Sequence, residues 1–580
     1  KSMNQIRIAL LVGASLLLSV FAGGAQEIKL STVAAKGSPI SFNLAAAQEG
    51  TKASIDWGDG VFEEYVIGPT FSEPSGMVKG ADIVIKGDVR RFNCTSSKLT
   101  MLDVSKCPQL EVLMAALNYL SEIDLSRNTE LANIELFSNN LKSLDVKACS
   151  KLQRLVVSGN FLSELDVTHC PELTYFDCAR MGRLERLDLA LCSKLTHLIA
   201  SECSLTGLVL SEKAPLEELL IADNSLSELN LAPYNKLKTL NCSGNKEIEE
   251  LILNAPELTQ LLAMNTAISQ LDLTHCPKLS YLMVTGASKL SKLLLPSPCL
   301  LTDLGMSSCN FDQIDFGTMS LLSQLWCNSN TRLTHLDVSK CPELTRLEAK
   351  KCALENLKLH PLPSKLAFLQ VPYNKLTALS LKGMAQLETL DLGSNQLSEI
   401  DLSECPQLKL LNLRNNQIHA LDLSRTSKLA MLGIPENKMT SQELNAIYRQ
   451  LPMLDEKPTK INLINGLRGD FSAQCSNTDI AEGLNWTPQI KGDGSGADLD
   501  ALLEPEGAKA VRFVVSDEQL AIQGQVLQGV VQLYAFDGSL LYTVRVEGSN
   551  VVLSRPVQGT YLAVYTDAIS GHRHLEKLYF

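Results

Sequence analysis

The chain of 580 residues has few aromatic side chains and no clusters of lysine or arginine, and its net charge is −12. Partners that carry phosphate, such as nucleic acid or anionic lipid, are bound through clustered cations, so both are disfavoured. After residue 22 there is also no apolar run of the ~20 residues that a membrane-spanning helix needs. The sequence therefore predicts no transmembrane helix and no nucleic-acid partner.

The short motifs of catalysis are missing as well. The sequence contains no G-x-S-x-G, no H-E-x-x-H, no P-loop and no catalytic Cys/His signature. Its histidines are scattered, and no Cys/His cluster has the spacing of a zinc site. We predict a protein that is not an enzyme and that holds no metal or cofactor. A carbohydrate-directed activity is left as an alternative to which no catalytic residue can be assigned.

The first 25 residues have the pattern of an export signal. Arg7 precedes an apolar run, Ile8–Ala22, that is too short to cross a bilayer. Gly23 and Ala25 supply the small residues that a signal peptidase requires, which predicts cleavage before Gln26. We expect an exported protein at the outer-membrane surface or outside the cell.

Leucine, in contrast, recurs at a fixed spacing. The pattern L-x-x-L-x-[apolar] begins at Leu99 and restarts every ten to twelve residues as far as Leu429. Two such half-turns form a unit of about 21 residues, and we count sixteen units. The heptapeptide LDVSKCP, at 102–108 and again at 336–342, is one half-turn that occurs in two units. Such a period predicts a solenoid, in which stacked coils bury a continuous column of leucine.

A second regular feature is an Asn or Cys three residues after most of the predicted strands. An inward amide at this position can satisfy backbone groups that the turn leaves unpaired, and a thiol tolerates the same burial. Asparagine is found at residues 118, 139, 160, 224, 245, 330, 374, 395, 416 and 437, and cysteine at residues 107, 149, 170, 192, 203, 276, 309, 341, 352 and 405. Cys149, Cys170 and Cys192 fall in consecutive coils. We interpret them as a ladder of buried free thiols, because parallel side chains have poor geometry for a disulfide.

This pattern, L-x-x-L-x-L-x-x-[NC]-x-L, resembles the leucine-rich repeat over residues 89–437. The 21-residue unit with LDVSxCP is similar to the internalin J type of bacterial repeat, whose members are surface adhesins. The resemblance implies a leucine-rich-repeat solenoid that binds its partner through the concave face.

One column of that predicted face is rich in apolar and aromatic side chains, which marks it as a candidate partner-binding surface. We expect its outward residues to be exposed in register. The candidate residues are Val156, Tyr175, Ile199, Leu220, Leu262, Tyr281, Met283 and Trp326.

The other half-turn carries a column of aspartates. Its members include Asp103, Asp124, Asp145, Asp166 and Asp188. Stacked carboxylates could bind a cation such as calcium, but we favour carboxylates that accept N–H groups of their own turns and stay solvated.

The segments around the repeats differ from them in composition. Residues 26–88 read as short strands that form a β cap, and Asp56 and Asp59 fall in a tight turn of that cap rather than in a cation site. Residues 438–490 contain a helix that begins near Thr440 or Ser441 and are expected to close the other end of the stack. Residues 491–510, rich in Gly and Asp, are a linker.

Residues 511–580 alternate strands and turns, the pattern of a β-sandwich. They resemble the C-terminal sorting domain of the type nine secretion system of the Bacteroidota, with Gly559 and Tyr561 in its G-x-Y element and Lys577 as its terminal lysine. The resemblance implies transfer across the outer membrane, removal of this domain by a sortase, and attachment to surface lipopolysaccharide.

The sequence as a whole predicts a cell-surface or secreted binding protein. We interpret it as an adhesin, with a role in virulence, that attaches to a protein or glycan on a host or neighbouring bacterial cell. A structural protein of a surface layer or biofilm matrix is the main alternative.

Overall fold

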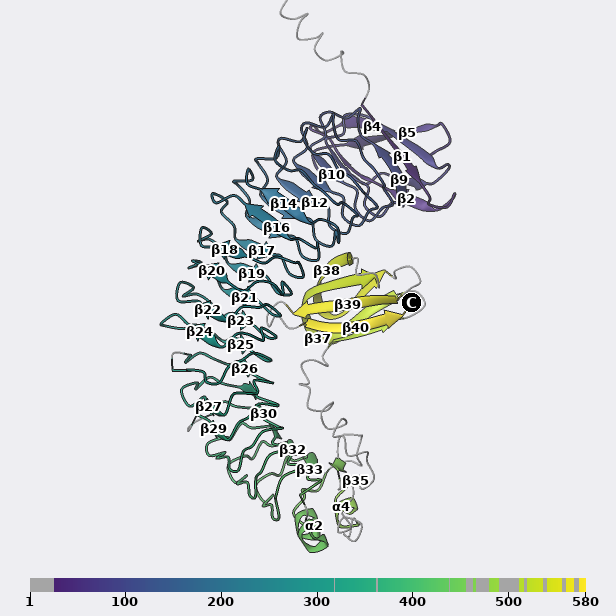
Figure 1. Ribbon diagram of the computed structural model, residues 1–580. Coiled ribbons are helices and arrows are strands. Elements are labelled where there is room, and N and C mark those ends of the chain that lie inside the picture. Colours follow the sequence, from purple (N-terminus) through teal and green to yellow (C-terminus); the bar gives the residue numbers. More distant parts are fainter. Residues whose placement is uncertain are drawn as a thin grey trace, which may run out of the picture. The chain divides into compact units, whose positions relative to one another are not determined.

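The computed structural model describes residues 26–454 except 318, 361–363 and 438, together with 463–465, 479–489 and five strands after residue 510 (Figure 1). For 463–465, 479 and the residues after 486, the description covers the backbone only. The predicted leader and the linker at 491–510 lie outside the described residues. The chain divides into two compact units, Lys1–Asn224 with Phe513–Phe580 and Ser225–Arg512.

The predicted N-terminal cap is a set of antiparallel strands that join directly to the first coil. Five of them form a sheet in the order β5-β4-β7-β1-β9. Their bounds are Phe62–Ile67, Thr51–Asp56, Asp82–Lys86, Glu27–Thr32 and Leu99–Asp103. Two further pairs are β2 (Pro39–Ser41) with β6 (Ser75–Met77), and β3 (Asn43–Ala45) with β8 (Arg91–Asn93). Because β9 begins the repeats, cap and repeats share one sheet.

Aromatic side chains fill the interior of the cap. Phe42 and Trp57 are buried and stack with ring centroids 5.7 Å apart, and Phe92 of the first coil lies 5.8 Å from Phe42. The Oδ1 atom of Asp56 accepts the N–H groups of Gly58, Asp59 and Gly60 at 2.9–3.0 Å. Asp56 therefore serves a tight turn, which confirms the interpretation made from the sequence.

In the first unit the coils stack as parallel strands of three residues, one strand per coil (Figure 1). These are β8, β10 (Val112–Met114), β11 (Asn133–Glu135), β12 (Arg154–Val156), β13 (Tyr175–Asp177), β15 (His197–Ile199) and β17 (Glu218–Leu220). Their middle residues, such as Leu113, Ile134 and Leu155, are fully buried. On the other side of the coils, β14 (Arg186–Leu189) pairs with β16 (Gly207–Leu210).

The second unit repeats this arrangement. Its long sheet contains β19 (Thr239–Asn241), β21 (Gln260–Leu262), β23 (Tyr281–Met283), β25 (Asp303–Gly305), β26 (Gln324–Trp326), β28 (Arg346–Glu348), β30 (Phe368–Gln370), β31 (Thr389–Asp391), β32 (Leu410–Asn412), β33 (Met431–Gly433), β34 (Leu463–Asn465) and β35 (Thr487–Gln489). Among the described residues, the opposite side has three strand pairs: β18 (Leu229–Leu231) with β20 (Leu251–Leu253), β22 (Gln270–Asp272) with β24 (Lys292–Leu294), and β27 (His335–Asp337) with β29 (Asn356–Lys358). The predicted solenoid of about 16 coils of about 21 residues is confirmed.

Buried asparagines hold successive coils together. Asn118 accepts the N–H of Leu99 at 2.9 Å and donates to the carbonyls of Cys94 and Ala115 at 3.0 Å. Asn395 makes the same contacts in the second unit, with Leu376, Val371 and Leu392. Each amide pairs backbone groups that would otherwise be buried without a partner, as the sequence predicted.

After the last leucine-rich coil the chain forms helix α2, Ser441–Tyr448. Thr440 caps its first turn, and Glu443 completes a capping box. A short helix α4, Asp479–Glu482, follows, and the buried indole of Trp486 donates to the carbonyl of Pro452 at 2.8 Å. The helix predicted from the sequence is confirmed, and Thr440 rather than Ser441 is its cap. Among the described residues, no helix has the length and apolar character needed to cross a bilayer.

The C-terminal strands are β36 (Val511–Val515), β37 (Gln519–Ala535), β38 (Leu540–Ser554), β39 (Thr560–Asp567) and β40 (Arg573–Tyr579). Antiparallel pairing joins β37 to β38 and β39, and β39 to β40. Tyr561 lies on β39 and Lys577 on β40, whereas Gly559 lies outside the described residues. The predicted two-layer sandwich and its sorting role stay predictions.

Candidate functional site

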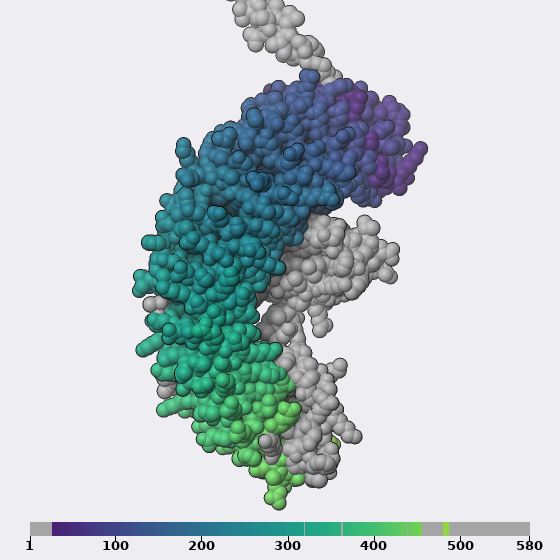
Figure 2. All heavy atoms as spheres, viewed as in Figure 1, coloured from purple at the N-terminus to yellow at the C-terminus, as the bar shows by residue number. Residues whose placement is uncertain are grey.

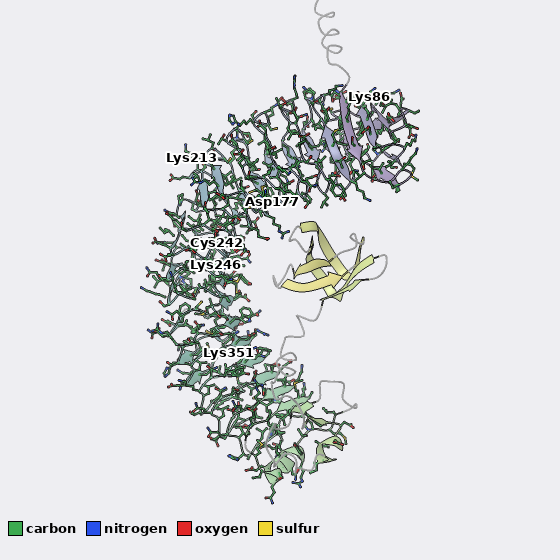
Figure 3. The ribbon with its side chains drawn as sticks, turned by 45° about the vertical axis from the view of Figure 1, so that its right-hand side comes forward. Lys86, Asp177, Lys213, Cys242, Lys246 and Lys351 are labelled. Atoms are coloured by element: carbon green, nitrogen blue, oxygen red, sulfur yellow. The ribbon has the colours of Figure 1, made fainter. Side chains whose placement is uncertain are left out.

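The candidate site is the outer side of the long sheet in each unit, which we call the sheet face. In each strand the middle residue points into the core, so the first and third residues lie on the sheet face. Figure 3 labels Asp177, a third residue of this kind, on the sheet side of its coil, and Lys213 on the opposite side. All eight residues predicted to bind a partner occupy first or third positions.

In the first unit, the structure corrects one of these predictions. Val156 is only 5% exposed and cannot contribute an exposed surface. Its register neighbours on the adjoining strands are Glu135 and Asp177, whose longer side chains flank the short branched one. Ile199 and Leu220 are half-buried and lie in register on β15 and β17.

Tyr175 is part of a stack that the sequence analysis did not foresee. The guanidinium of Arg154 lies 3.8 Å from the centroid of the Tyr175 ring, and the His197 ring stacks on Tyr175 with centroids 5.8 Å apart. Arg154 also pairs with Glu135 at 3.1 Å. The three side chains occupy first positions of adjacent strands, so Arg154 and His197 lie against the Tyr175 ring from the two neighbouring coils.

A carboxyl group with altered acidity lies beside this stack. Burial raises the pKa of Asp177 above its ordinary range, although the N–H of Ala179 and the hydroxyl of Ser158 both donate to it. The same burial raises the pKa of Tyr175. The sheet face of the first unit therefore combines apolar, aromatic and acidic groups in a partly desolvated setting.

In the second unit the predicted residues form a mainly apolar surface. Leu262, Tyr281, Met283 and Trp326 are all half-buried. Gly305 stands in register between Met283 and Trp326, and a Cβ atom added there would lie 2.1 Å from the Met283 sulfur. Met283 therefore fills the space that glycine leaves, and any larger residue at 305 would displace it.

Farther along the second unit the sheet face becomes polar and buried. Glu348 is buried and pairs with Arg346 at 2.8 Å, while the Arg346 guanidinium lies 3.7 Å from the Phe368 ring centroid. Asn412 donates to Asp391 at 2.9 Å, and both side chains are buried. These polar groups pair with one another, so this end offers less apolar surface than the part around Trp326.

The aspartates in the column on the other half-turns accept hydrogen bonds from the turns in which they lie. The Oδ1 atom of each aspartate accepts the N–H of the residue two positions later at 2.9–3.0 Å, as in Asp103, Asp124, Asp145, Asp166 and Asp188. Hydrogen bonds from Ser126 and Thr168 lower the pKa values of Asp124 and Asp166. The five aspartates line a groove of about 980 Å³ in the first unit. Within the described part of the chain, no group of three ligands could hold a metal ion. These contacts favour the interpretation as turn caps.

The cysteines of residues 26–454 are free thiols, and all except Cys352 are buried. Burial raises the pKa values of the three ladder cysteines, to about 11 for Cys149 and Cys192 and to about 12 for Cys170, where the two neighbouring cysteines contribute. Cys170 contacts the carbonyl of Val146 at 3.8 Å in the preceding coil. The three thiols are thus positioned as the predicted ladder, with little tendency to form the reactive thiolate.

Comparison with known proteins bears on the identity of the repeat. Residues 385–426 match the family described as leucine-rich repeats, in two copies. The two coils of this segment are leucine-rich repeats. Among curated proteins, none matches the sequence.

Several solved structures are similar to the chain. The functional domain of InlJ from Listeria monocytogenes, described as including a cysteine ladder, is 19% identical over 87% of this chain and 93% of its own, with a TM-score of 0.44. YopM from Yersinia enterocolitica is 26% identical over 60% of this chain and 79% of its own, with a TM-score of 0.48. A leucine-rich repeat protein from Bacteroides eggerthii is 13% identical over 61% of this chain and 84% of its own, with a TM-score of 0.42.

The 21-residue register also identifies residues of the site that were not among the predicted ones. Arg154 and His197 stand at the same register position as Tyr175, one coil before and one coil after it. Gly305 stands between the candidates Met283 and Trp326 in the column of third strand residues. The two columns taken together place these residues beside the predicted ones.

Proposed function

We propose that this chain is an exported leucine-rich-repeat binding protein, displayed on the cell surface or secreted, that acts as an adhesin. Its partner is a protein on a host or neighbouring bacterial cell. Binding uses the sheet face, and no catalytic step is involved.

The observation that carries the proposal is the surface around Trp326. Half-buried Leu262, Met283 and Trp326 lie on one face of a sheet, and Gly305 leaves a recess that Met283 occupies. Methionine adapts its shape to a partner, and tryptophan is among the residues whose truncation at interfaces costs about 2 kcal/mol or more. An apolar centre of this kind with polar neighbours is typical of a protein-binding surface.

The sheet face of the first unit supports the same function with different chemistry. Ile199 and Leu220 supply apolar area, and the stack of Arg154, Tyr175 and His197 presents polar edges that can orient a partner. Because neighbouring strands fix all three side chains, little conformational entropy remains to be lost on binding.

Export and sorting complete the proposal. The apolar run at 8–22 acts as a signal peptide, and residues 511–580 act as the sorting domain that directs the chain through the type nine system to surface lipopolysaccharide. The strand-rich backbone of β36–β40 is compatible with that role.

The experiment is a pull-down from host-cell and bacterial surface extracts with purified protein spanning residues 26–490. A variant that carries Leu262→Asp serves as the test, and Leu294→Asp is its control, because Leu294 is an exposed leucine on the opposite side of the coils. The proposal expects one or a few proteins that the native chain and the control retain and the test variant loses. Recovery of nothing by the native chain would instead favour a structural role in a surface layer or matrix.

A further inference from the structure

A second surface of the first unit is separate from the sheet face. It is formed by the segments that come after the strands of the long sheet in sequence. Four consecutive coils contribute aligned hexapeptides: TSSKLT (95–100), ALNYLS (116–121), FSNNLK (137–142) and SGNFLS (158–163). We call this surface the flank. These 24 residues contain two lysines and no aspartate or glutamate, in a chain of net charge −12. Within these hexapeptides all the charge is positive, and Glu122 and Glu164 directly follow two of them.

Hydrogen bonds fix the alignment of the four hexapeptides. The N–H groups of Tyr119, Asn140 and Phe161 each donate to the carbonyl of a leucine in the preceding coil, at 2.8–2.9 Å. Each of these residues directly follows a buried asparagine that is itself held by backbone groups of adjoining coils. The side chains of the flank consequently project from a rigid base, in register from coil to coil.

The aromatic residues of the flank are unusually exposed. Tyr119 is 50% and Phe161 51% exposed, more than any other aromatic side chain in the described part of the chain. Two residues before Tyr119, Leu117 adopts a left-handed conformation with φ 56°. Most equivalent positions carry Ser, Asn, Asp or Gly, such as Ser138 and Gly159. The left-handed conformation recurs at this position along the repeat, at Arg180, Lys351 and Tyr373 among others, so it belongs to the repeat turn.

Cations alternate with these aromatic rings along the stack. Lys98 is the register neighbour of Tyr119 in the preceding coil, and Lys142 lies in the coil between Tyr119 and Phe161. Both lysines are exposed, and no ion pair joins either one to a carboxylate among the described residues. With a coil rise of about 4.8 Å, Tyr119 and Phe161 stand roughly 10 Å apart. Exposed Arg183 follows in the next coil.

We propose that the flank binds an acidic glycan in which charged and uncharged sugars alternate. The lysines pair with the carboxylates of the glycan, and the C–H faces of its sugar rings pack on Tyr119 and Phe161, whose ring faces are electron-rich. Exposed Ser121, Asn140 and Ser163 supply hydrogen bonds to sugar hydroxyls.

Two other polyanions fit the flank less well. An acidic protein would need a contiguous apolar centre, whereas here each aromatic ring is separated from the next by a cationic coil. Nucleic acid would need more cations than the two lysines and one arginine present. Both alternatives are nevertheless outcomes of the test below.

The test measures binding of a hyaluronan oligosaccharide to the purified protein by titration calorimetry, with a neutral chitin oligosaccharide for comparison. The variants are Lys98→Glu with Lys142→Glu, and Tyr119→Ala with Phe161→Ala. Lys246→Glu is the matched control, because Lys246 has the same place in its coil as Lys98, directly after the buried polar residue (Asn245 and Ser97), but stands beside Glu247 (Figure 3). All of these side chains are exposed, and thermal unfolding verifies that each variant is folded.

We expect saturable binding of hyaluronan, which weakens as salt is added, and no binding of chitin. Each double variant should lose at least about tenfold in affinity, with the control within about twofold of the native protein. The proposal fails if the native protein does not bind hyaluronan or if both double variants bind it normally. It also fails if polyglutamate or a single-stranded oligonucleotide displaces hyaluronan at equal concentration, which would assign the flank to a different class of partner. The sheet-face variant Leu262→Asp should leave this binding unchanged, so its outcome is separate from that of the proposed adhesin function.

Discussion

The side chain of Asn139 accepts the backbone N–H of Leu120 in the preceding coil at 3.0 Å, and its amide donates to the carbonyl of Ala115 at 2.9 Å and to Leu136 at 3.0 Å. One side chain thus connects the turn of its own coil to the backbone of the coil before it. The same relation recurs along both units, so the stack is held by buried amides as well as by leucine.

The first prediction follows from this relation. Asn139→Ala removes the partners of three buried backbone groups, so the free energy of unfolding should fall by about 3 kcal/mol. Asn140→Ala is the control, because Asn140 is the next residue and is exposed. It should change stability by less than about 0.5 kcal/mol. Urea unfolding monitored by circular dichroism measures both, and equal effects of the two substitutions would refute the role given to the buried amide.

A second prediction concerns thiol reactivity. Only the thiolate reacts with alkylating reagents, and burial raises the pKa of most cysteines, to about 11 for Cys149 and about 12 for Cys341. At pH 8 we expect iodoacetamide to modify few cysteines of the native protein and most of them after denaturation without reductant. Mass spectrometry counts the modified thiols. Several disulfide-linked peptides in a non-reducing digest would contradict the free-thiol ladder.

The raised thiol pKa values also predict how stability depends on pH. Above the ordinary thiol pKa of 9.0, the unfolded chain loses protons that the folded chain retains up to about pH 11 to 12 at Cys149, Cys170 and Cys192. The contribution of these thiols to the free energy of unfolding is fully present below pH 9. It is lost as the pH rises from 9 through about 11 to 12. Between pH 9 and about 12, we expect the free energy of unfolding to decline less steeply in a variant with all three cysteines replaced by alanine than in the native protein. Parallel curves for the variant and the native protein would exclude this contribution.

The periodic residues made the fold predictable from the sequence, whereas the site depends on neighbours that the period does not describe. The strict spacing of leucine and of asparagine or cysteine predicted the coil, its buried columns and the direction of each strand residue. The exposure of Val156 was predicted wrongly, because exposure on the sheet face depends on neighbours in adjacent coils, which here are Glu135 and Asp177. The stack on Tyr175 likewise needs residues 21 and 22 positions away in sequence. The burial of Val156 and the stack on Tyr175 both depend on the lengths of side chains in neighbouring coils, which the residues of one coil do not reveal.

The next prediction tests export and processing. If residues 511–580 are a sorting domain joined by a linker, protein extracted from the cell surface should end near residue 510. Deletion of residues 557–580 should leave the chain in the periplasm. Peptide mapping and cell fractionation measure the two effects. An intact C-terminus on surface protein, or normal surface display of the truncated chain, would rule out the sorting role.

The central claim is that the sheet face around Trp326 binds a protein partner. Its most direct test is the affinity of the purified protein for the captured partner, measured for the native chain, Trp326→Ala and the control Leu294→Ala. Truncation of Trp326 should weaken binding by about 2 kcal/mol, roughly thirtyfold, because a central aromatic side chain contributes most where it is desolvated. Leu294→Ala should bind as the native chain does, and the melting temperature of both variants should stay within a few degrees of it. Unchanged affinity of a folded Trp326→Ala protein would contradict the claim.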